Sequence, residues 1–223
     1  WAEDAGTDRS ETTENWQLLT TELRPLKGWR INGDFAYHST GVKRLNVKKA
    51  VIETYVDGSL VPHGETLPSQ AQQVSENAYY WSTNIYTTYD KSIAQKHHFT
   101  AMVGMQLEYS NTNVLTATRT NLIVPDVPSL NTANGNFTVG ESMSHWATQG
   151  YFGRVNYNFD EKYLLEINGR YDGTSRFRRG RRWGFFPSFS AGWNLDKENF
   201  WSGIGAIINT FKIRISWGQL GNQ

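Results

Sequence analysis

The sequence predicts an all-β protein whose strands run up and down as one antiparallel sheet. Three observations predict it: apolar residues recur at every second position, short connections alternate with long ones, and aromatic residues recur near strand ends. Successive side chains of a strand point to opposite faces, so this period of two indicates a sheet between two different environments. A transmembrane β-barrel and a soluble β-sandwich both alternate in this way, and the period alone does not separate them.

Eight segments carry the alternation. In the clearest of them, residues 99–109, Phe99, Val103 and Leu107 alternate with Thr100 and Gln106. Segment 79–89 is weaker and segment 15–24 is the least regular, while a short helical turn is expected near residues 197–201. The expected strands, in chain order, are residues 15–24, 29–37, 79–89, 99–109, 151–159, 163–171, 183–193 and 211–217.

The connections between these segments alternate in length. Outer-membrane barrels have short turns on one side of the membrane and long loops on the other, whereas a sandwich has no reason to order its loops in this way. Residues 196–206 break the series. The short connections are 25–28, 90–96 and 160–161, the long ones are 39–77 and 118–144, and 174–182 is intermediate.

Aromatic residues bracket several segments on one parity. Tyr163 and Tyr171 bound one strand, and Trp183 and Trp193 bound the next. Spacings of eight to ten residues match an apolar band about 25 Å tall with an aromatic girdle at each edge. The alternative is ordinary aromatic packing in a soluble sheet. Together with the alternating connections, this spacing favours the transmembrane barrel.

Composition removes several classes of protein. The 223 residues contain no Cys, so disulfides and Cys-based metal sites are excluded, and a net charge of +1 argues against a nucleic-acid binder. No apolar run is long enough for a transmembrane helix, and the first residues lack the pattern of a signal peptide. No catalytic triad or nucleophile elbow is present, so we expect no enzyme and no cofactor.

Four ordered stretches carry a family resemblance. Residues 146–157 read WATQGYFGRVNY, residues 162–177 read KYLLEINGRYDGTSRF, residues 183–193 read WGFFPSFSAGW, and residues 212–223 read KIRISWGQLGNQ. This combination resembles the SusC/RagA-type TonB-dependent outer-membrane transporters. The resemblance is strong over residues 75–223 and looser over residues 15–37.

The resemblance implies a 22-stranded barrel in the outer membrane of a Gram-negative bacterium, closed by a plug and capped by a SusD-like lipoprotein. The TonB complex would drive import of glycans or peptides through that plug. Residues 1–223 are then expected to be part of the barrel wall, about eight strands with no plug domain, signal peptide or TonB box, whose first and last strands have no partner in the chain. The alternative is a soluble β-sandwich that binds carbohydrate on an aromatic platform.

The polar positions of the alternating strands supply the candidate substrate residues. If the apolar parity faces lipid, the polar one faces the barrel lumen, where such side chains either meet substrate or form salt bridges within the wall or to the plug. The lumen candidates are Arg154, Asn156, Glu166, Asn168 and Arg170.

Two further clusters need an explanation. His97 and His98 are adjacent, so in a strand they point to opposite faces and cannot readily share a metal; we expect solvated histidines at a turn. The second cluster falls in a predicted extracellular loop, where it either meets lipopolysaccharide phosphates or is simply solvated. It consists of Arg176, Arg178, Arg179, Arg181 and Arg182.

Overall fold

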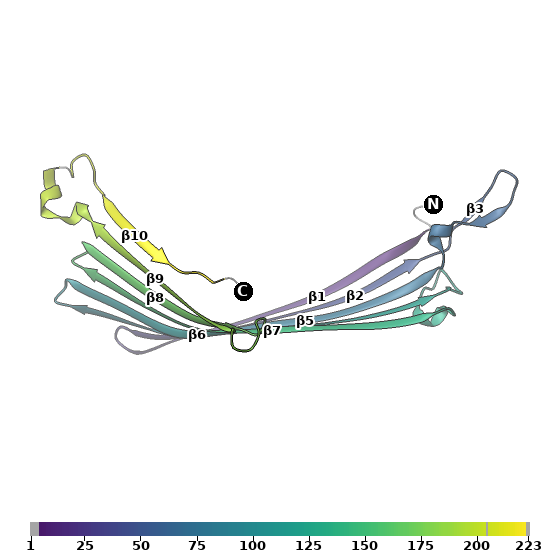
Figure 1. The fold of residues 1–223 in the computed structure, drawn as a ribbon, viewed down its shortest axis with the longest axis horizontal. Coiled ribbons are helices and arrows are strands. Elements are labelled where there is room, and N and C mark those ends of the chain that lie inside the picture. Colours follow the sequence, from purple (N-terminus) through teal and green to yellow (C-terminus); the bar gives the residue numbers. More distant parts are fainter. Residues whose placement is uncertain (1–4, 204, 222–223) are drawn as a thin grey trace. The chain divides into compact units, whose positions relative to one another are not determined.

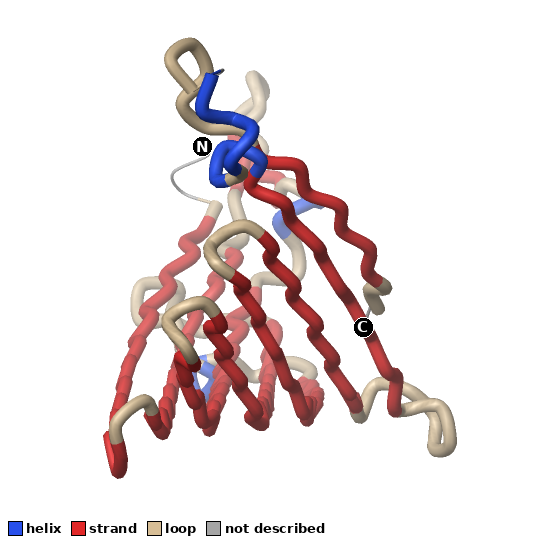
Figure 2. The backbone as a smooth tube through the Cα atoms, turned by 90° about the vertical axis from the view of Figure 1, so that its left-hand side faces the viewer, coloured by secondary structure: helices blue, strands red, loops and turns tan. Residues whose placement is uncertain are grey.

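The computed structural model describes residues 5–203 and 205–221, and strands dominate them (Figures 1 and 2). The strands are β1 (Gly6–Leu26), β2 (Trp29–Lys48), β3 (Ile52–Thr54), β4 (Leu60–Pro62), β5 (Gln70–Ile93), β6 (His97–Thr120), β7 (Phe137–Phe159), β8 (Tyr163–Thr174), β9 (Trp183–Asn194) and β10 (Lys212–Gly218). The short 3-10 turns are η1 (Gly64–Thr66), η2 (Leu130–Thr132), η3 (Leu195–Lys197) and η4 (Asn199–Gly203). The expected helical turn near residues 197–201 therefore exists, as 3-10 helix.

Eight strands form one antiparallel sheet in the order β1-β2-β5-β6-β7-β8-β9-β10. Each strand pairs with the strand of this sheet that precedes or follows it along the chain, as an up-and-down topology requires. Strands β1 and β10 lie at its two edges, and within the described residues they are not paired with each other. The expectation for the first and last strands is confirmed at their outer edges: each pairs with one neighbour, β2 or β9, and has no partner among the described residues on its other side. Strands β3 and β4 form a separate hairpin that the alternation did not reveal.

The register places odd-numbered residues of β7 to β10 on one face. Val155 pairs with Ile167 across β7 and β8, and Ile167 pairs with Phe189 across β8 and β9. Ile215 pairs with Ala191 in the same way. Odd residues thus share an apolar face, and even residues share the opposite face. The expected separation of apolar and polar parities is confirmed for these strands.

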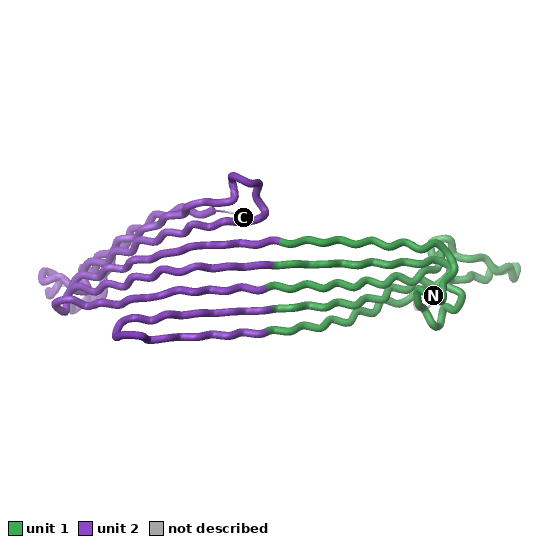
Figure 3. Tube along the Cα trace, turned by 90° about the horizontal axis from the view of Figure 1, so that it is seen from below, with its two compact units in different colours: residues 1–16, 38–80, 110–145 green, residues 17–37, 81–109, 146–223 purple. Residues whose placement is uncertain are grey.

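The chain comprises two compact units whose boundary falls inside the long strands (Figure 3). Unit 1 comprises residues 1–16, 38–80 and 110–145, and unit 2 comprises residues 17–37, 81–109 and 146–223. The strands predicted from residue 29 onward lie in unit 2, except for Tyr79 and Tyr80, which belong to unit 1. Every site described below is contained in unit 2.

The long strands extend well beyond the predicted segments. Strands β2, β5, β6 and β7 have 20 to 24 residues, so the long connections shrink to residues 49–69 and 121–136. The extensions, such as residues 38–48 and 110–120, are mostly polar at both odd and even positions, with a few apolar residues such as Val47. A strand with water on both faces needs no apolar alternation, because its backbone hydrogen bonds form whatever the side chains are. The apolar alternation of the sequence therefore could not predict these extensions of the strands.

The hairpin between β7 and β8 is confirmed, with three residues rather than two between the strands. Phe159 pairs with Tyr163, and the Lys162 amide donates to the Phe159 carbonyl at 2.9 Å. Asp160 and Glu161 have φ angles of +53° and +57°. Such left-handed conformations match the right-handed twist of a hairpin, but they disfavour residues that carry a Cβ.

Replacing Glu161 by Gly is therefore expected to stabilise the protein by roughly 0.5–1 kcal/mol. The substitution also removes an exposed ion pair with Lys197, which contributes little. Urea unfolding in detergent measures the change. Glu161→Ala is the matched control: it removes the same carboxylate but keeps the Cβ, so the gain should be absent. Equal stabilities of the Gly and Ala variants would contradict the backbone explanation.

The sheet has no apolar layer packed over it in the described chain. The buried hydrophobic residues are Val47, Ala71, Ala133 and Trp201, far fewer than the core of a sandwich requires. No helix among the described residues has the length and apolarity needed to cross a bilayer.

Candidate functional site

The candidate site is the polar face of unit 2, defined as the even-numbered residues of β7 to β10 together with their β6 neighbours. The register sets Arg154 opposite Asn168 and Asn156 opposite Glu166. Arg170 lies on the same parity of β8. All five expected lumen residues therefore share one face.

Three of the five form a hydrogen-bonded row. Arg154 donates from Nε to Asn168 Oδ1 at 2.6 Å, and Asn168 donates from Nδ2 to Glu166 Oε1 at 2.9 Å. The amide of Asn168 is oriented by accepting from one neighbour and donating to the other. Among the described residues, Arg154 has no carboxylate within 4 Å, so its positive charge is available to an external anion or hydroxyl group.

Arg170 is held more firmly. Its Nε and Nη2 donate to the two oxygens of Asp172, each at 3.0 Å, and Nη2 also reaches Gln106 Oε1 at 3.3 Å. Its guanidinium lies 5.6 Å from the centroid of the Phe152 ring. A bidentate pair with a mostly buried carboxylate fixes the side chain, so Arg170 is better suited to shaping the wall than to capturing a ligand.

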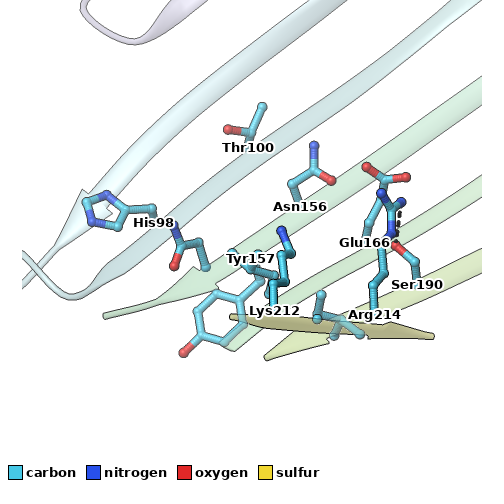
Figure 4. A pocket seen from close by; sticks show the side chains of 12 residues that line it. His98, Thr100, Asn156, Tyr157, Glu166, Ser190, Lys212 and Arg214 are labelled. Atoms are coloured by element: carbon cyan, nitrogen blue, oxygen red, sulfur yellow. Dashed lines mark hydrogen bonds between the residues drawn. The ribbon is translucent and has the colours of Figure 1, made fainter. Parts of the chain in front are cut away.

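A hollow of about 370 Å³ opens on the polar face between β6 and β10 (Figure 4). Asn156 and Glu166 line it together with Lys212 and Arg214, and Arg214 donates to Ser190 Oγ at 3.2 Å. Two cations against one carboxylate make this surface attractive to anionic or hydroxyl-rich groups. The expected set missed Lys212 and Arg214, although both have the even parity that marks this face.

The two adjacent histidines take different faces, as expected, but the expectation that they are solvated residues of a turn is wrong. His97 Nδ1 lies 2.8 Å from Tyr157 Oη on the apolar face, whereas His98 Nδ1 lies 2.8 Å from Ser92 Oγ and His98 lines the hollow. Both open β6 rather than forming the turn, and both are half-buried. The part of the chain that the structure describes contains no cluster of three potential metal ligands.

Glu198 fastens the connection between β9 and β10 to the neighbouring strands. Its carboxylate accepts hydrogen bonds from Tyr163 Oη at 2.8 Å, Trp193 Nε1 at 3.1 Å and Lys162 Nζ at 3.2 Å. These donors, Tyr163 first, lower the pKa of Glu198 below its usual value because they stabilise the charged form.

The lowered pKa predicts a pH dependence of stability. Glu198 stabilises the folded protein above the pKa it has when unfolded, and this stabilisation is lost as the pH falls through the lower folded pKa. Glu198→Gln should therefore lower the urea midpoint at neutral pH and flatten its fall on acidification. Glu161→Gln, in the adjacent exposed turn, serves as the control. A variant whose pH profile matches that of the parent protein would contradict this role.

The sequence matches the family model described as "TonB dependent receptor-like, beta-barrel" over residues 1–221. The chain belongs to this TonB-dependent receptor β-barrel family. Two curated relatives agree: TonB-dependent receptor P39 of Formosa agariphila is 31% identical over 97% of the chain, and TonB-dependent receptor SusC of Bacteroides thetaiotaomicron is 42% identical over 33% of it.

Solved structures show the same fold. A structure of the RagAB peptide importer in the "closed-closed" state aligns with 98% of the chain at a TM-score of 0.83 and 17% identity, and its "open-open" state aligns with 97% at 0.80. The chain covers 23% of those structures and 20% of the receptor P39, which means that it spans about a fifth of the length of such proteins. The sheet is thus a segment of a TonB-dependent β-barrel, and the resemblance stated from the sequence is confirmed.

Proposed function

We propose that this chain forms part of the barrel wall of a SusC-like, TonB-dependent importer in the outer membrane of a Gram-negative bacterium. One observation carries the proposal: the apolar face has no cover, while charged residues occupy the opposite face. Ile167, Phe185 and Phe189 are 53%, 60% and 48% exposed. Water would not stabilise so much contiguous apolar surface, but the hydrocarbon of a bilayer does.

Two aromatic clusters define the height of the proposed bilayer crossing. At one end of β8 and β9 the rings of Tyr163 and Trp193 lie 6.2 Å apart, and at the other end those of Tyr171 and Trp183 lie 4.8 Å apart. Eight residues separate Tyr163 from Tyr171, roughly 26 Å along a strand. At the tilt of barrel strands, about 35–45°, this length spans a height of about 20 Å between the two residues, comparable to the apolar band of an outer-membrane barrel, about 25 Å.

In this proposal the polar face borders the substrate path. A plug inside the barrel, energised through TonB, opens the path, and a SusD-like lipoprotein delivers glycans or peptides from outside. Arg154, with its uncommitted charge, and the hollow at Asn156 and Glu166 are the wall positions best placed to contact cargo. A β-sandwich that binds carbohydrate is not supported, because the described residues form one eight-stranded sheet and, besides it, only the two-stranded hairpin of β3 and β4.

The 223 residues contain no cysteine, so single cysteines introduced into them test the two faces directly once any cysteine elsewhere in the protein is replaced by serine. Single substitutions Ile167→Cys and Asn168→Cys place adjacent thiols on opposite faces. In the protein carrying this chain, inserted in membranes, the thiol at 168 should react with a small aqueous maleimide. The thiol at 167 should instead be labelled by a lipid-soluble reagent. Equal aqueous reactivity at both positions would overturn the barrel-wall proposal.

Uptake assays test the cargo. Cells expressing the protein are given labelled oligosaccharides or labelled peptides, and Arg154→Gln is compared with the parent protein. We expect one of the two classes to be imported and its uptake to fall in the variant. Lys27→Gln, in a turn outside the polar face, should leave uptake unchanged. Import of neither class would contradict the proposed substrates, while unchanged uptake in Arg154→Gln would remove that residue from the path.

A further inference from the structure

The connection between β8 and β9 is the strongest local concentration of charge in unit 2. Residues 175–182, here called the arginine loop, contain five arginines and no acidic residue. The whole chain has a net charge of only +1, so this loop is not a sample of the average surface. The two long connections of the chain, residues 49–69 and 121–136, both contain acidic residues.

The arginines of this loop lack acidic partners. All residues of the loop are exposed, and no ion pair in the described part of the chain involves any of its five guanidinium groups. Arg176 lies 4.5 Å from the centroid of the Trp146 ring, and Arg182 donates to the Phe177 carbonyl at 3.0 Å. These contacts order the two ends of the loop and leave Arg178, Arg179 and Arg181 directed to the surroundings.

The loop also lies directly beside an aromatic girdle. Trp183 follows it, and the Trp183 ring stacks with Tyr171 at 4.8 Å and faces Tyr151 at 6.3 Å on the apolar face. In a membrane, such aromatic belts lie at the level of the lipid headgroups. Arg181 and Arg182 are two residues and one residue from Trp183, within roughly 7 Å along the chain. Their guanidinium groups must then lie at the depth of the lipid phosphates.

We propose that the arginine loop binds the phosphate groups of membrane lipids. A guanidinium presents paired donors that fit phosphate oxygens, and a cluster without carboxylates leaves those donors free. Lipid phosphate is favoured over nucleic acid or free phosphate because only a lipid presents phosphates next to the aromatic girdle that borders this loop. The inference rests on the proposed placement of the apolar face in a bilayer.

The test uses the protein carrying this chain, reconstituted in nanodiscs with bisphosphorylated lipid A or with its dephosphorylated form. The loop variant combines Arg178→Gln, Arg179→Gln and Arg181→Gln. Its matched control combines Lys27→Gln, Lys91→Gln and Lys96→Gln, which remove three charges at the opposite, short-turn end of unit 2. Native mass spectrometry counts the lipids retained. We expect the loop variant to lose about tenfold or more in retention of the phosphorylated lipid, and the control to change less than twofold.

Three results would overturn the inference: equal retention of the two lipids by the parent protein, equal losses in loop variant and control, or displacement of the lipid by inorganic phosphate at matched concentration. The last would reassign the loop to free phosphate. Labelling at Ile167→Cys and Asn168→Cys is measured on the same samples. If that labelling pattern fails, the barrel-wall proposal fails and this inference falls with it; if it holds, a negative lipid result removes the inference alone.

Discussion

Ile167→Arg is expected to destabilise the protein by about 2–4 kcal/mol, the cost of a lipid-facing arginine at the bilayer midplane. Ile167 lies on the apolar face of β8, four residues from each of the girdle residues Tyr163 and Tyr171, and its side chain is 53% exposed. An arginine there cannot reach either interface without distorting the strand. Reversible urea unfolding in lipid vesicles measures the difference.

Asn156→Arg provides the control with the same new side chain on the polar face. Asn156 pairs with Glu166 across β7 and β8, so the added guanidinium meets a carboxylate in an open hollow that Lys212 and Arg214 also line. We expect a change of less than about 1 kcal/mol, because exposed ion pairs contribute little. Similar losses for both variants would show that the two faces share one environment, which a membrane barrel does not allow.

If the apolar face meets lipid as proposed, the bilayer explains why so much of this fold could be predicted from the sequence. A strand between lipid and water must alternate at every residue, and the girdle residues mark where it enters and leaves the apolar band. The eight sheet strands and the hairpin at Asp160 and Glu161 are confirmed. The five lumen candidates share one face of the sheet, while their contact with substrate stays a prediction. Alternation does not predict every part of a strand: residues 38–48 belong to β2 without alternating.

The site was predicted less completely than the fold. Parity placed Arg154 and Arg170 on one face, but it could not show that Asp172 already neutralises Arg170 while Arg154 keeps its charge. Which of the two arginines is paired depends on the positions of the side chains, because the alternating sequence pattern around both is similar. The hollow that adds Lys212 and Arg214 depends on the register of β9 and β10, which is fixed by strand pairing rather than by any local motif.

Gly104→Val is expected to destabilise the protein by about 1–3 kcal/mol, the usual cost of overpacking, although valine favours strands. A Cβ on Gly104 of β6 would lie 2.5 Å from Tyr86 Cβ, 2.7 Å from the Ile85 carbonyl oxygen and 2.7 Å from Phe152 Cζ. The missing side chain makes room for the Phe152 ring, over which Arg170 lies. The variant should therefore also displace Arg170 from the polar face.

Gly153→Val separates this packing effect from the general effect of replacing a strand glycine. A Cβ at Gly153 of β7 would have its nearest neighbour, the Met102 carbonyl oxygen, at 3.6 Å, an ordinary contact. Because valine fits a half-exposed strand better than glycine, Gly153→Val should be neutral or slightly stabilising. Urea midpoints of the two variants in the same detergent decide the matter. If Gly104→Val is as stable as Gly153→Val, then Gly104 is not required for the seating of Phe152, and the position of Arg170 does not depend on it.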